Sequence, residues 1–404
     1  MLDFGEYLPE DARLYDGRTG WEAHNAFPLI YQKATTDYLR QVRGDDFMYF
    51  ARAGWTGTQA FAPVTWSGDP AASFDDEKGL PAQVRAGINA GLSGIAFWGS
   101  DVDGYACNAD PPPDRDVFYR WVEFGALSPD MHDENACAQA PVGAPPKWWI
   151  WTDAATTELF AKYTKLHTRL FPYTYAAAEE ATRTGVPIMR HPILMNPEAD
   201  GARAAELEYW FGPSLYVAPV VRRGATSRTA WLPPGTWFDW WTLAPVTGGG
   251  TITRDAPMDV LPMWLKSGGI VAMLDPSIDT LAPATEPSVV TLASVAGVLD
   301  VRVGLDAGAP RADTVLVDGT TLSALLTSSS SPALPAGFAT AASESDLATC
   351  AACGRAETLP GGAVRVRVTA APTDDSTVVA GSLVLKGFRF PTPTRVRWDV
   401  VIKP

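Results

Sequence analysis

Short apolar runs alternate with helix-like segments over the first 200 residues, and this alternation limits the possible folds more than any other feature of the chain. The runs expected to form strands are residues 47–51, 62–66, 94–98 and 186–190. The segments expected to form helices are residues 27–42, 83–90, 117–126, 154–170 and 173–181. Strands that alternate with helices in this way are typical of an α/β fold.

The expected strands end in clusters of polar residues and glycines. Arg52, Asp69 and Asp101 follow the first three strands in turn. Functional residues at the carboxyl ends of parallel strands are typical of a (β/α)8 TIM barrel. Counting forward from Asp3 gives only about four complete strand–helix units, so residues 1–205 are predicted to form the C-terminal half of a barrel.

The chain changes character after residue 205. Short apolar runs separated by Pro-Pro-Gly and triple-glycine turns follow, and from residue 286 Val, Thr, Ser and Ala dominate without clear helical segments. This composition predicts a proximal β-sandwich at residues 206–285 and a distal β-sandwich-like domain at residues 286–404. The expected fold class is therefore α/β plus all-β, a partial barrel followed by two β-sandwich domains.

The charge and hydropathy of the chain exclude several kinds of partner. A formal net charge of −14 argues against nucleic acid, whose phosphates demand a basic surface, and equally against anionic membranes. The sequence contains no run of about 18 apolar residues, so no transmembrane helix is expected.

Four cysteines leave the compartment open. Cys107 and Cys137 lie in irregular, Pro-rich stretches, and a disulfide between them would fit secretion or a periplasmic location; two free thiols are the alternative. Cys350 and Cys353 resemble half of a zinc site, but no second pair exists, so a local disulfide is favoured over a metal. No N-terminal signal peptide is present in the sequence as given.

Two carboxylates stand on loops beside aromatic residues. Asp3 ends a short apolar run and precedes a Gly turn that leads to a second carboxylate, Glu6. Asp69 lies on a Gly-Pro loop directly after Trp66. Cleavage of a glycosidic bond needs one carboxylate to attack or stabilise the anomeric carbon and one to protonate the leaving oxygen. Read alone, Asp3 would be a solvated terminal residue and Asp69 an ordinary turn residue.

Several motifs occur together and in order within the first 275 residues. They are residues 3–9 (DFGEYLP), 24–33 (with His24, Asn25, Pro28 and Lys33), 52–59 (RAGWTGTQ), 66–69 (WSGD), 100–105 (SDVDGY), 124–129 (FGALSP), 170–173 (LFPY) and 211–219 (FGPSLYVAP). The series resembles the C-terminal half of glycoside hydrolase family 31, the retaining α-glucosidase and α-xylosidase family. A single Asp-Phe-Gly match would be weak, but the ordered series favours the assignment.

The resemblance implies a role for each site residue. Asp3 would be the nucleophile that forms a glycosyl-enzyme ester, and Asp69 the acid that protonates the leaving group and then the base that activates water. The residues that would bind substrate or support the site are Arg52, Trp66, Trp98, Asp101, Tyr105, His132 and Glu6. Arg52 would hold Asp3 ionised or bind sugar hydroxyls, Trp66 and Trp98 would wall the sugar subsite, and Glu6 would support its loop. No metal or organic cofactor is expected, because two carboxylates suffice.

The sequence departs from the family pattern at two places. Asp103 stands where the family usually has Gly, so an extra carboxylate is expected to enter the site region. His132 is only loosely in register with the family's histidine that binds a substrate hydroxyl. Tyr105 stands where sulfoquinovosidases of this family place a tyrosine near the sulfonate, and the other residues that read that group would lie upstream of Met1.

The leading function is a retaining, α-glucosidase-like glycoside hydrolase that acts on a carbohydrate substrate. The alternatives are a non-catalytic carbohydrate-binding or vestigial protein, and a glycosidase for a modified sugar such as sulfoquinovose. The sugar, the linkage and the oligomeric state stay open.

Half a barrel has a structural consequence. A barrel closes because every strand pairs on both sides, whereas four strands alone leave two open edges, which favour aggregation. We therefore expect the chain to be a fragment of a larger enzyme, with coding sequence that continues in frame upstream of Met1. The isolated chain is expected to be poorly folded and inactive.

Overall fold

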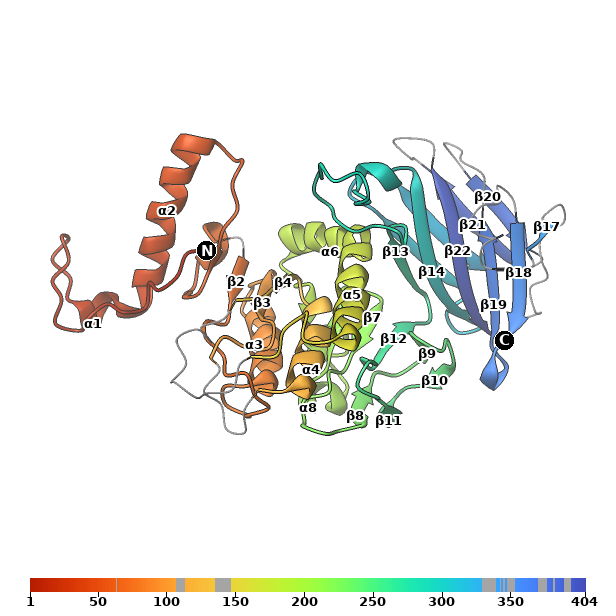
Figure 1. Cartoon of the computed structure of the whole chain (residues 1–404), viewed down its shortest axis with the longest axis horizontal. Helices are drawn as coiled ribbons and strands as arrows, with labels where there is room; N and C mark the ends of the chain where they lie inside the picture. The colour runs from red at the N-terminus through yellow and green to blue at the C-terminus, as the bar shows by residue number, and fades with distance from the viewer. Residues whose placement is uncertain are drawn as a thin grey trace.

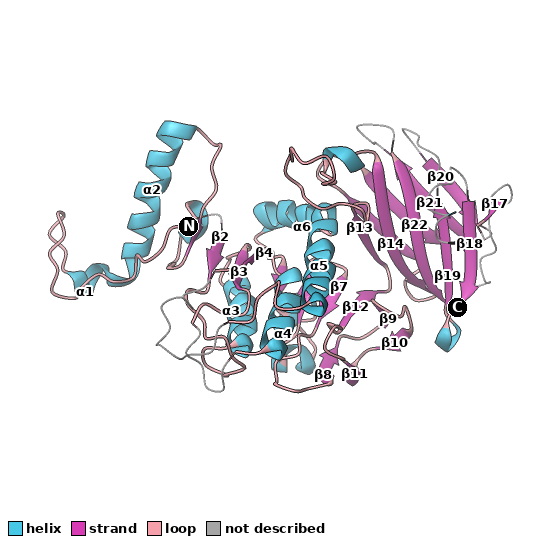
Figure 2. Cartoon of the chain, in the orientation of Figure 1, coloured by secondary structure: helices cyan, strands magenta, loops and turns pink. Residues whose placement is uncertain are grey.

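The chain folds into a part that combines helices with a small parallel sheet and a part made almost entirely of strands, as Figure 1 and Figure 2 show. The structure is a computed structural model. It describes residues 1–404 apart from 63, 107–112, 135–146, 329–338, 342, 344–345, 347–352, 370–375, 381 and 389–393.

Five helices of the described residues match the expected segments, and three short ones, at residues 20–23, 192–195 and 200–204, were not predicted. They are α1 (Gly20–Ala23), α2 (Phe27–Arg43), α3 (Leu80–Leu92), α4 (Arg115–Ala126), α5 (Ala154–Arg169), α6 (Phe171–Thr184), α7 (Pro192–Met195) and α8 (Asp200–Ala204). Two of them begin at an aspartate whose carboxylate accepts hydrogen bonds from the first turn: Asp114 before α4 and Asp153 before α5. Two end at a glycine with positive φ, Gly44 after α2 and Gly185 after α6.

The first sheet is parallel throughout. Its strands, in spatial order, are β1 (Phe50–Ala51), β2 (Val64–Trp66), β3 (Trp98–Asp101) and β4 (Asp130–His132). Leu2 pairs in parallel with Ala51, so the start of the chain adds to the β1 edge. The alternation of strands and helices is confirmed here. The expected strand at residues 94–98 is displaced, because β3 begins at Trp98, and β4 is a strand that the sequence pattern did not predict.

A second, antiparallel sheet packs beneath the helices. Its strands, in spatial order, are β10 (Pro245–Thr247), β9 (Thr236–Asp239), β12 (Met263–Lys266), β7 (Leu215–Val217), β6 (Tyr209–Phe211) and β5 (Met189–Arg190). A separate ribbon joins β8 (Ser227–Leu232) to β11 (Gly250–Asp255). The run at 186–190 was expected to continue the first sheet, but β5 pairs antiparallel with β6 instead.

One apolar core joins the parallel sheet, the helices and the second sheet. Trp98, Phe124 and Tyr209 form a chain of ring contacts across it, with centroid distances of 6.2 and 6.3 Å. Helix α4 lies at its centre, because every residue from Asp116 to Ala126 is buried. The helix-facing side of the first sheet is thereby packed into this core.

Two further sheets form the distal part of the chain. The larger contains β13 (Gly269–Met273), β14 (Val298–Asp306), β22 (Arg395–Lys403), β19 (Val364–Thr369), β18 (Cys353–Thr358) and β17 (Ala339–Thr340), in that spatial order. The smaller contains β15 (Arg311–Val315), β16 (Thr321–Leu326), β21 (Leu383–Phe388) and β20 (Ser376–Ala380). Alternate residues of both sheets enter one shared apolar core, as expected for an all-β region.

The segment that carries α1 and α2 projects away from the rest of the molecule (Figure 1). We call residues 10–48 the N-terminal arm. It holds several large side chains that are mostly exposed, among them Tyr15, Trp21, Tyr38 and Met48. The arm is tied at its base, where Gln32 Nε2 donates to the carbonyl of Ala53.

The cysteine expectations are tested at one position. Cys353 is disulfide-bonded, whereas Cys107, Cys137 and Cys350 lie outside the described residues. Within the described ranges, no helix has the length and apolar character needed to cross a membrane.

Candidate active site

Arg52 is the centre of a cluster of carboxylates at one end of the parallel sheet. Its Nη1 atom lies 2.9 Å from Asp3 Oδ1 and 3.4 Å from Asp69 Oδ1. Its Nη2 atom lies 2.6 Å from Glu6 Oε1. Because Asp3 and Asp69 contact the same nitrogen atom, their oxygens are separated by no more than the two distances combined. The structure thus brings together two carboxylates that are 66 positions apart in the sequence.

The backbone places each of these side chains by strand pairing. Leu2 donates its N–H to the carbonyl of Phe50 (2.8 Å) and accepts one from Arg52 N (3.3 Å), which sets Asp3 beside Arg52. Asp69 follows the neighbouring strand β2 on a turn at Gly68, where φ is +79°. A Cβ at Gly68 would lie 2.9 Å from Cδ of Arg52, so only glycine leaves room for the guanidinium stem.

The turn after Asp3 is strained. Phe4 has a φ of 63°, a conformation that a bulky residue adopts only when its surroundings impose it. Its N–H donates to Asp3 Oδ1 at 2.7 Å, and its ring lies 4.6 Å from Cζ of Arg52. Both contacts fix the Asp3 carboxylate and the guanidinium in their positions.

A second charged group lies at the ends of the next two strands. Protonated His132 donates from Nε2 to Asp101 Oδ1 and from Nδ1 to Asp130 Oδ2, both at 2.9 Å. Burial opposes the charge, but these two hydrogen bonds outweigh it and raise the pKa of His132 to about 9. Burial raises the pKa of Asp101, and the hydrogen bond from His132 partly offsets that rise. At neutral pH the histidine is therefore an imidazolium.

Strand alternation decides which aromatic residues join the cluster. Phe50 and Trp66 lie on the same face as His132, with ring centroids 5.1 Å apart for Phe50 and Trp66 and 5.2 Å apart for Phe50 and His132. Trp98 lies on the opposite face and packs into the core against Phe124 and α3. The structure therefore places Trp66 on the face of the sheet that carries His132, in contact with Phe50, and the predicted subsite residue Trp98 on the opposite face, within the core.

Tyr105 and Glu134 lie close enough to Asp69 and Asp101 for the charges of these carboxylates to affect them. Tyr105 N donates to the carbonyl of Pro70 on the Asp69 loop, and burial together with the charge of Asp69 raises the pKa of its hydroxyl. Burial and the charge of Asp101 raise the pKa of Glu134. Glu134, Asp130 and Phe50 were not predicted as site residues. The sequence does contain one indication of Asp130 and Glu134: they lie two positions before and after His132, so in an extended strand all three would face the same side.

The extra carboxylate of Asp103 does not join this cluster. Its side chain is fully buried, burial raises its pKa well above the ordinary value, and the neighbouring charge is Lys147. Lys147 Nζ in turn donates to Asp133 Oδ1 (2.6 Å) and to the carbonyl of Val102 (2.8 Å). Asp103 lies beyond the end of β3 and has a φ of 65°. The alternation of side chains along the strand, which places Asp101 on the face of the cluster, therefore does not extend to Asp103.

No metal site is evident in the described part of the chain: His, Cys, Asp and Glu side chains nowhere gather there in threes suited to an ion. Three carboxylates surround the Arg52 guanidinium, which is 12% exposed, and two of them, Asp3 and Asp69, share its Nη1 atom and are 30% and 48% exposed. Such a pair of carboxyl groups can accept a proton, donate a proton and stabilise positive charge at a reacting centre.

Comparisons with known proteins give a consistent result. Residues 2–177 match the glycosyl hydrolases family 31 TIM-barrel domain, and residues 185–271 match the glycosyl hydrolase family 31 C-terminal domain. An isomaltosyltransferase from Sporosarcina globispora is 34% identical over 266 residues, covering 64% of this chain and 23% of that protein. A sulfoquinovosidase from Escherichia coli is 30% identical over 285 residues, covering 70% of this chain and 41% of that protein.

A solved structure agrees over a longer stretch. The cycloalternan-forming enzyme from Listeria monocytogenes, in complex with a pentasaccharide substrate, aligns with 96% of this chain and 38% of its own, with a TM-score of 0.75. At 22% identity this likeness concerns the fold alone. The chain spans between about a quarter and two fifths of the length of these relatives.

Proposed function

The chain belongs to glycoside hydrolase family 31, and from that premise we propose that it carries the catalytic carboxylates of a retaining, α-glucosidase-like glycosidase. One observation supports the proposal above others: Asp3 and Asp69 contact the same Nη1 atom of Arg52. Retaining enzymes hold their two carboxyl groups about 5–5.5 Å apart, and inverting enzymes hold them about 6.5–9.5 Å apart. A shared guanidinium nitrogen favours the shorter spacing.

The proposed reaction has two steps. Asp3 attacks the anomeric carbon while Asp69 gives its proton to the glycosidic oxygen, so the glycosidic bond breaks and an ester forms on Asp3. Asp69, now a carboxylate, takes a proton from water, and the resulting hydroxide attacks the same carbon and releases Asp3. Arg52 stabilises the carboxylate of Asp3 in the free enzyme and after release.

The His132 group supplies sugar contacts in this proposal. Asp101 is fully buried, and its Oδ2 atom has no hydrogen-bond partner among the described residues. A buried oxygen of this kind is stabilised by a donor, and we propose that a sugar hydroxyl provides one once the side chains that cover the oxygen have moved aside. His132 holds the other oxygen and so fixes the direction in which Asp101 accepts.

We further propose that other strands must complete the site. Beyond the parallel pairing of Leu2 with Ala51, no described strand pairs with this edge of the first sheet, and the N-terminal arm beside it exposes large apolar side chains. A TIM barrel is closed, and its substrate is surrounded by loops from all eight strands. The isolated chain is therefore expected to show little or no turnover, whereas a form with a closed barrel should be active.

A charged sugar such as sulfoquinovose is the second candidate, because two sulfoquinovosidases are 30% and 32% identical to the chain. Tyr105 beside the Asp69 loop agrees with it. The charges argue the other way. Arg52 and His132 are the cations of the described cluster, and each is already paired with carboxylates. We therefore expect a neutral α-glucoside to be the better substrate.

The test is hydrolysis of an aryl α-glucoside and an aryl α-sulfoquinovoside. It uses the chain alone and a fusion that places the N-terminal barrel half of the Escherichia coli relative before it. We expect the fusion to release the α-anomer first, as NMR would show. Asp3→Asn should lower turnover by at least about 10³-fold, and Asp200→Asn, at a fully exposed position, should not. Turnover that survives Asp3→Asn, or a β-anomer as first product, would refute the proposal. A preference for the sulfoquinovoside would select the second candidate.

A further inference from the structure

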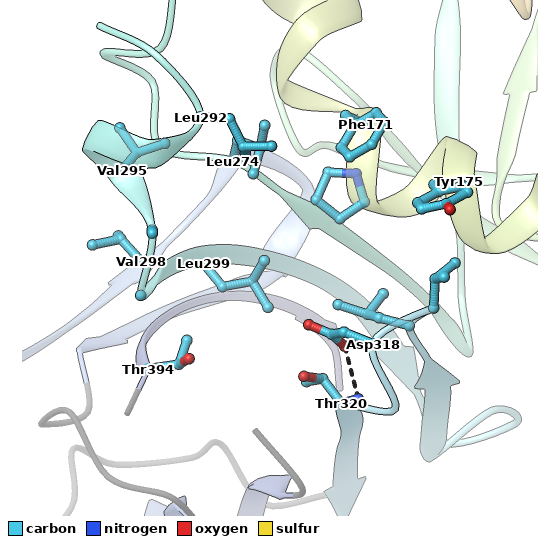
Figure 3. Close-up of a pocket in the computed structure, with 15 residues that line it drawn as sticks. Phe171, Tyr175, Leu274, Leu292, Val295, Val298, Leu299, Asp318, Thr320 and Thr394 are labelled. Atoms are coloured by element: carbon cyan, nitrogen blue, oxygen red, sulfur yellow. Dashed lines mark hydrogen bonds between the residues drawn. The ribbon is translucent and has the colours of Figure 1, made fainter. Parts of the chain in front are cut away.

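A cavity of about 350 Å³ opens between helix α6 and one end of the distal sheets. Figure 3 shows its lining, which comes from α6, from Leu274 after β13, from the segment that leads into β14, from the turn between β15 and β16, and from Thr394 before β22. None of these residues belongs to the Arg52 cluster. The volume lies within the range of about 300–1,000 Å³ that is typical of small-molecule sites.

One side of the cavity is aromatic and apolar. Phe171 and Tyr175 stand one turn apart on α6, and their rings stack with centroids 5.3 Å apart and planes at 27°. Pro172 lies between them in the sequence and also lines the cavity. Tyr175 remains 47% exposed, so much of its ring is available to a ligand. Leu299 continues the apolar surface below these rings (Figure 3).

The other side carries oxygen atoms. Asp318, Thr320 and Thr394 lie across from the aromatic residues in Figure 3. The carboxylate of Asp318 is held by the backbone N–H of Thr320, which donates to Oδ1 at 2.8 Å. This bond orients the carboxylate at the mouth of the cavity, where Asp318 is exposed. The cavity therefore has an apolar side and a side that accepts hydrogen bonds.

We propose that this cavity is a second, non-catalytic site that binds a neutral oligosaccharide. A pyranose ring has an apolar C–H face that packs on aromatic rings and a rim of hydroxyl groups that donate to carboxylate and hydroxyl oxygens. Asp318 is the one charged side chain of the described lining, and the chain as a whole carries a net charge of −14. Anionic ligands are therefore repelled, and the exposed carboxylate of Asp318 offers a hydroxyl-bearing ligand an acceptor that a purely apolar ligand would not use.

The test measures binding of isomaltotriose and of maltotriose to the whole chain by calorimetry, in the Asp3→Asn background to prevent turnover. Tyr175→Ala and Asp318→Asn should each weaken binding about fivefold to tenfold, since each removes one stacking or hydrogen-bonding contact. Matched exposed positions elsewhere provide controls: Tyr38→Ala on α2 and Asp200→Asn on α8 should leave the affinity unchanged.

The outcomes separate this site from the proposed catalysis. Equal affinity of the Tyr175→Ala, Asp318→Asn and control variants, or no binding of either trisaccharide, overturns the proposal. Binding of dodecyltrimethylammonium that depends on Tyr175, without any binding of sugar, also overturns it and identifies a site for apolar cations. The binding test stands whether or not turnover is found, because it needs only the folded chain.

Discussion

At the scale of single residues, the site depends on Gly68, because a larger residue there would clash with the side chain of Arg52. Gly68 turns the chain toward Asp69 with a φ of +79° and leaves room for Arg52 Cδ, which would lie 2.9 Å from a new Cβ. On this path Arg52 contacts Asp3, Glu6 and Asp69 at once. The geometry of the carboxylates is therefore set as much by the space at Gly68 as by the charges.

Replacing Gly68 by Ala tests this dependence. The variant should lose about 1–3 kcal/mol of stability from positive φ and contact with Arg52, and turnover of the completed enzyme should fall at least about tenfold. Gly224 has a similar φ of +71° with open space around it, so Gly224→Ala should cost stability alone. Equal turnover in the two variants would show that Arg52 does not need this path.

His132 predicts a pH dependence of stability. Its pKa is about 9 in the folded chain and about 6.5 in an unfolded one. A raised pKa stabilises the fold below pH 6.5, and that contribution is lost as the pH rises to about 9. His132→Gln should therefore lower the free energy of unfolding by on the order of 2–3 kcal/mol at pH 6 and by much less at pH 10. Urea unfolding at both pH values measures this, and a difference that grows with pH would contradict it.

At the scale of helices and strands, periodic patterns of apolar and polar residues explain which elements could be predicted from the sequence. The helices were predictable because caps and apolar periodicity mark them, as at Asp153 before α5. The separation of Trp98 from the cluster was also encoded: Trp98 and Asp101 are three positions apart on one strand, so they face opposite sides. The prediction that Trp98 walls the sugar subsite followed the family resemblance and did not take this alternation into account.

Other features could not be read from local sequence. Strand β4 is three residues long and carries Asp130 and His132, so it lacks the apolar character of a typical strand. The run at 186–190 has that character, yet β5 pairs with β6 in a different sheet. Which sheet a short strand joins is decided by packing between distant segments, and this information is absent from the strand itself.

The cap of α5 gives a direct test at this scale. Asp153 accepts a hydrogen bond from Thr156 N at 2.7 Å, one of the first-turn donors that would otherwise have no partner in the helix. Asp153→Ala should cost about 1 kcal/mol of stability, measured by thermal unfolding. Asp200→Ala, at the exposed start of the short helix α8, serves as the control and should cost less than half of that. An equal loss in both would show that the cap is not what stabilises α5.

At the scale of the whole molecule, one buried arginine joins helix α4 to the ends of the β8–β11 ribbon. Arg120 on α4 donates to the carbonyls of Ala225 (3.1 Å) and Ala256 (2.7 Å), and it pairs with Glu123 (3.1 Å). Both charged side chains are almost completely buried. Burial raises the pKa of Glu123 to about 7 even with Arg120 beside it.

Removing this arginine should therefore destabilise the whole chain. Arg120→Met should cost about 3–5 kcal/mol, because it leaves Glu123 buried without a counter-charge. The loss should be larger at pH 8 than at pH 5, since Glu123 can become neutral at low pH. Arg203→Met, at a half-exposed position, should cost less than about 0.5 kcal/mol. A loss independent of pH would mean that the carbonyl contacts matter and the charge pair does not.

The central claim is that Asp3 becomes covalently bound to sugar. The most direct measurement is mass spectrometry of peptides from the closed-barrel fusion after treatment with 5-fluoro-α-glucosyl fluoride, which slows the hydrolysis of a glycosyl ester. The account predicts a fluoroglucosyl group on the peptide that contains Asp3, and none in the Asp3→Asn variant. A label on Asp69 or Asp101 in an active enzyme, or turnover without any label, would contradict it.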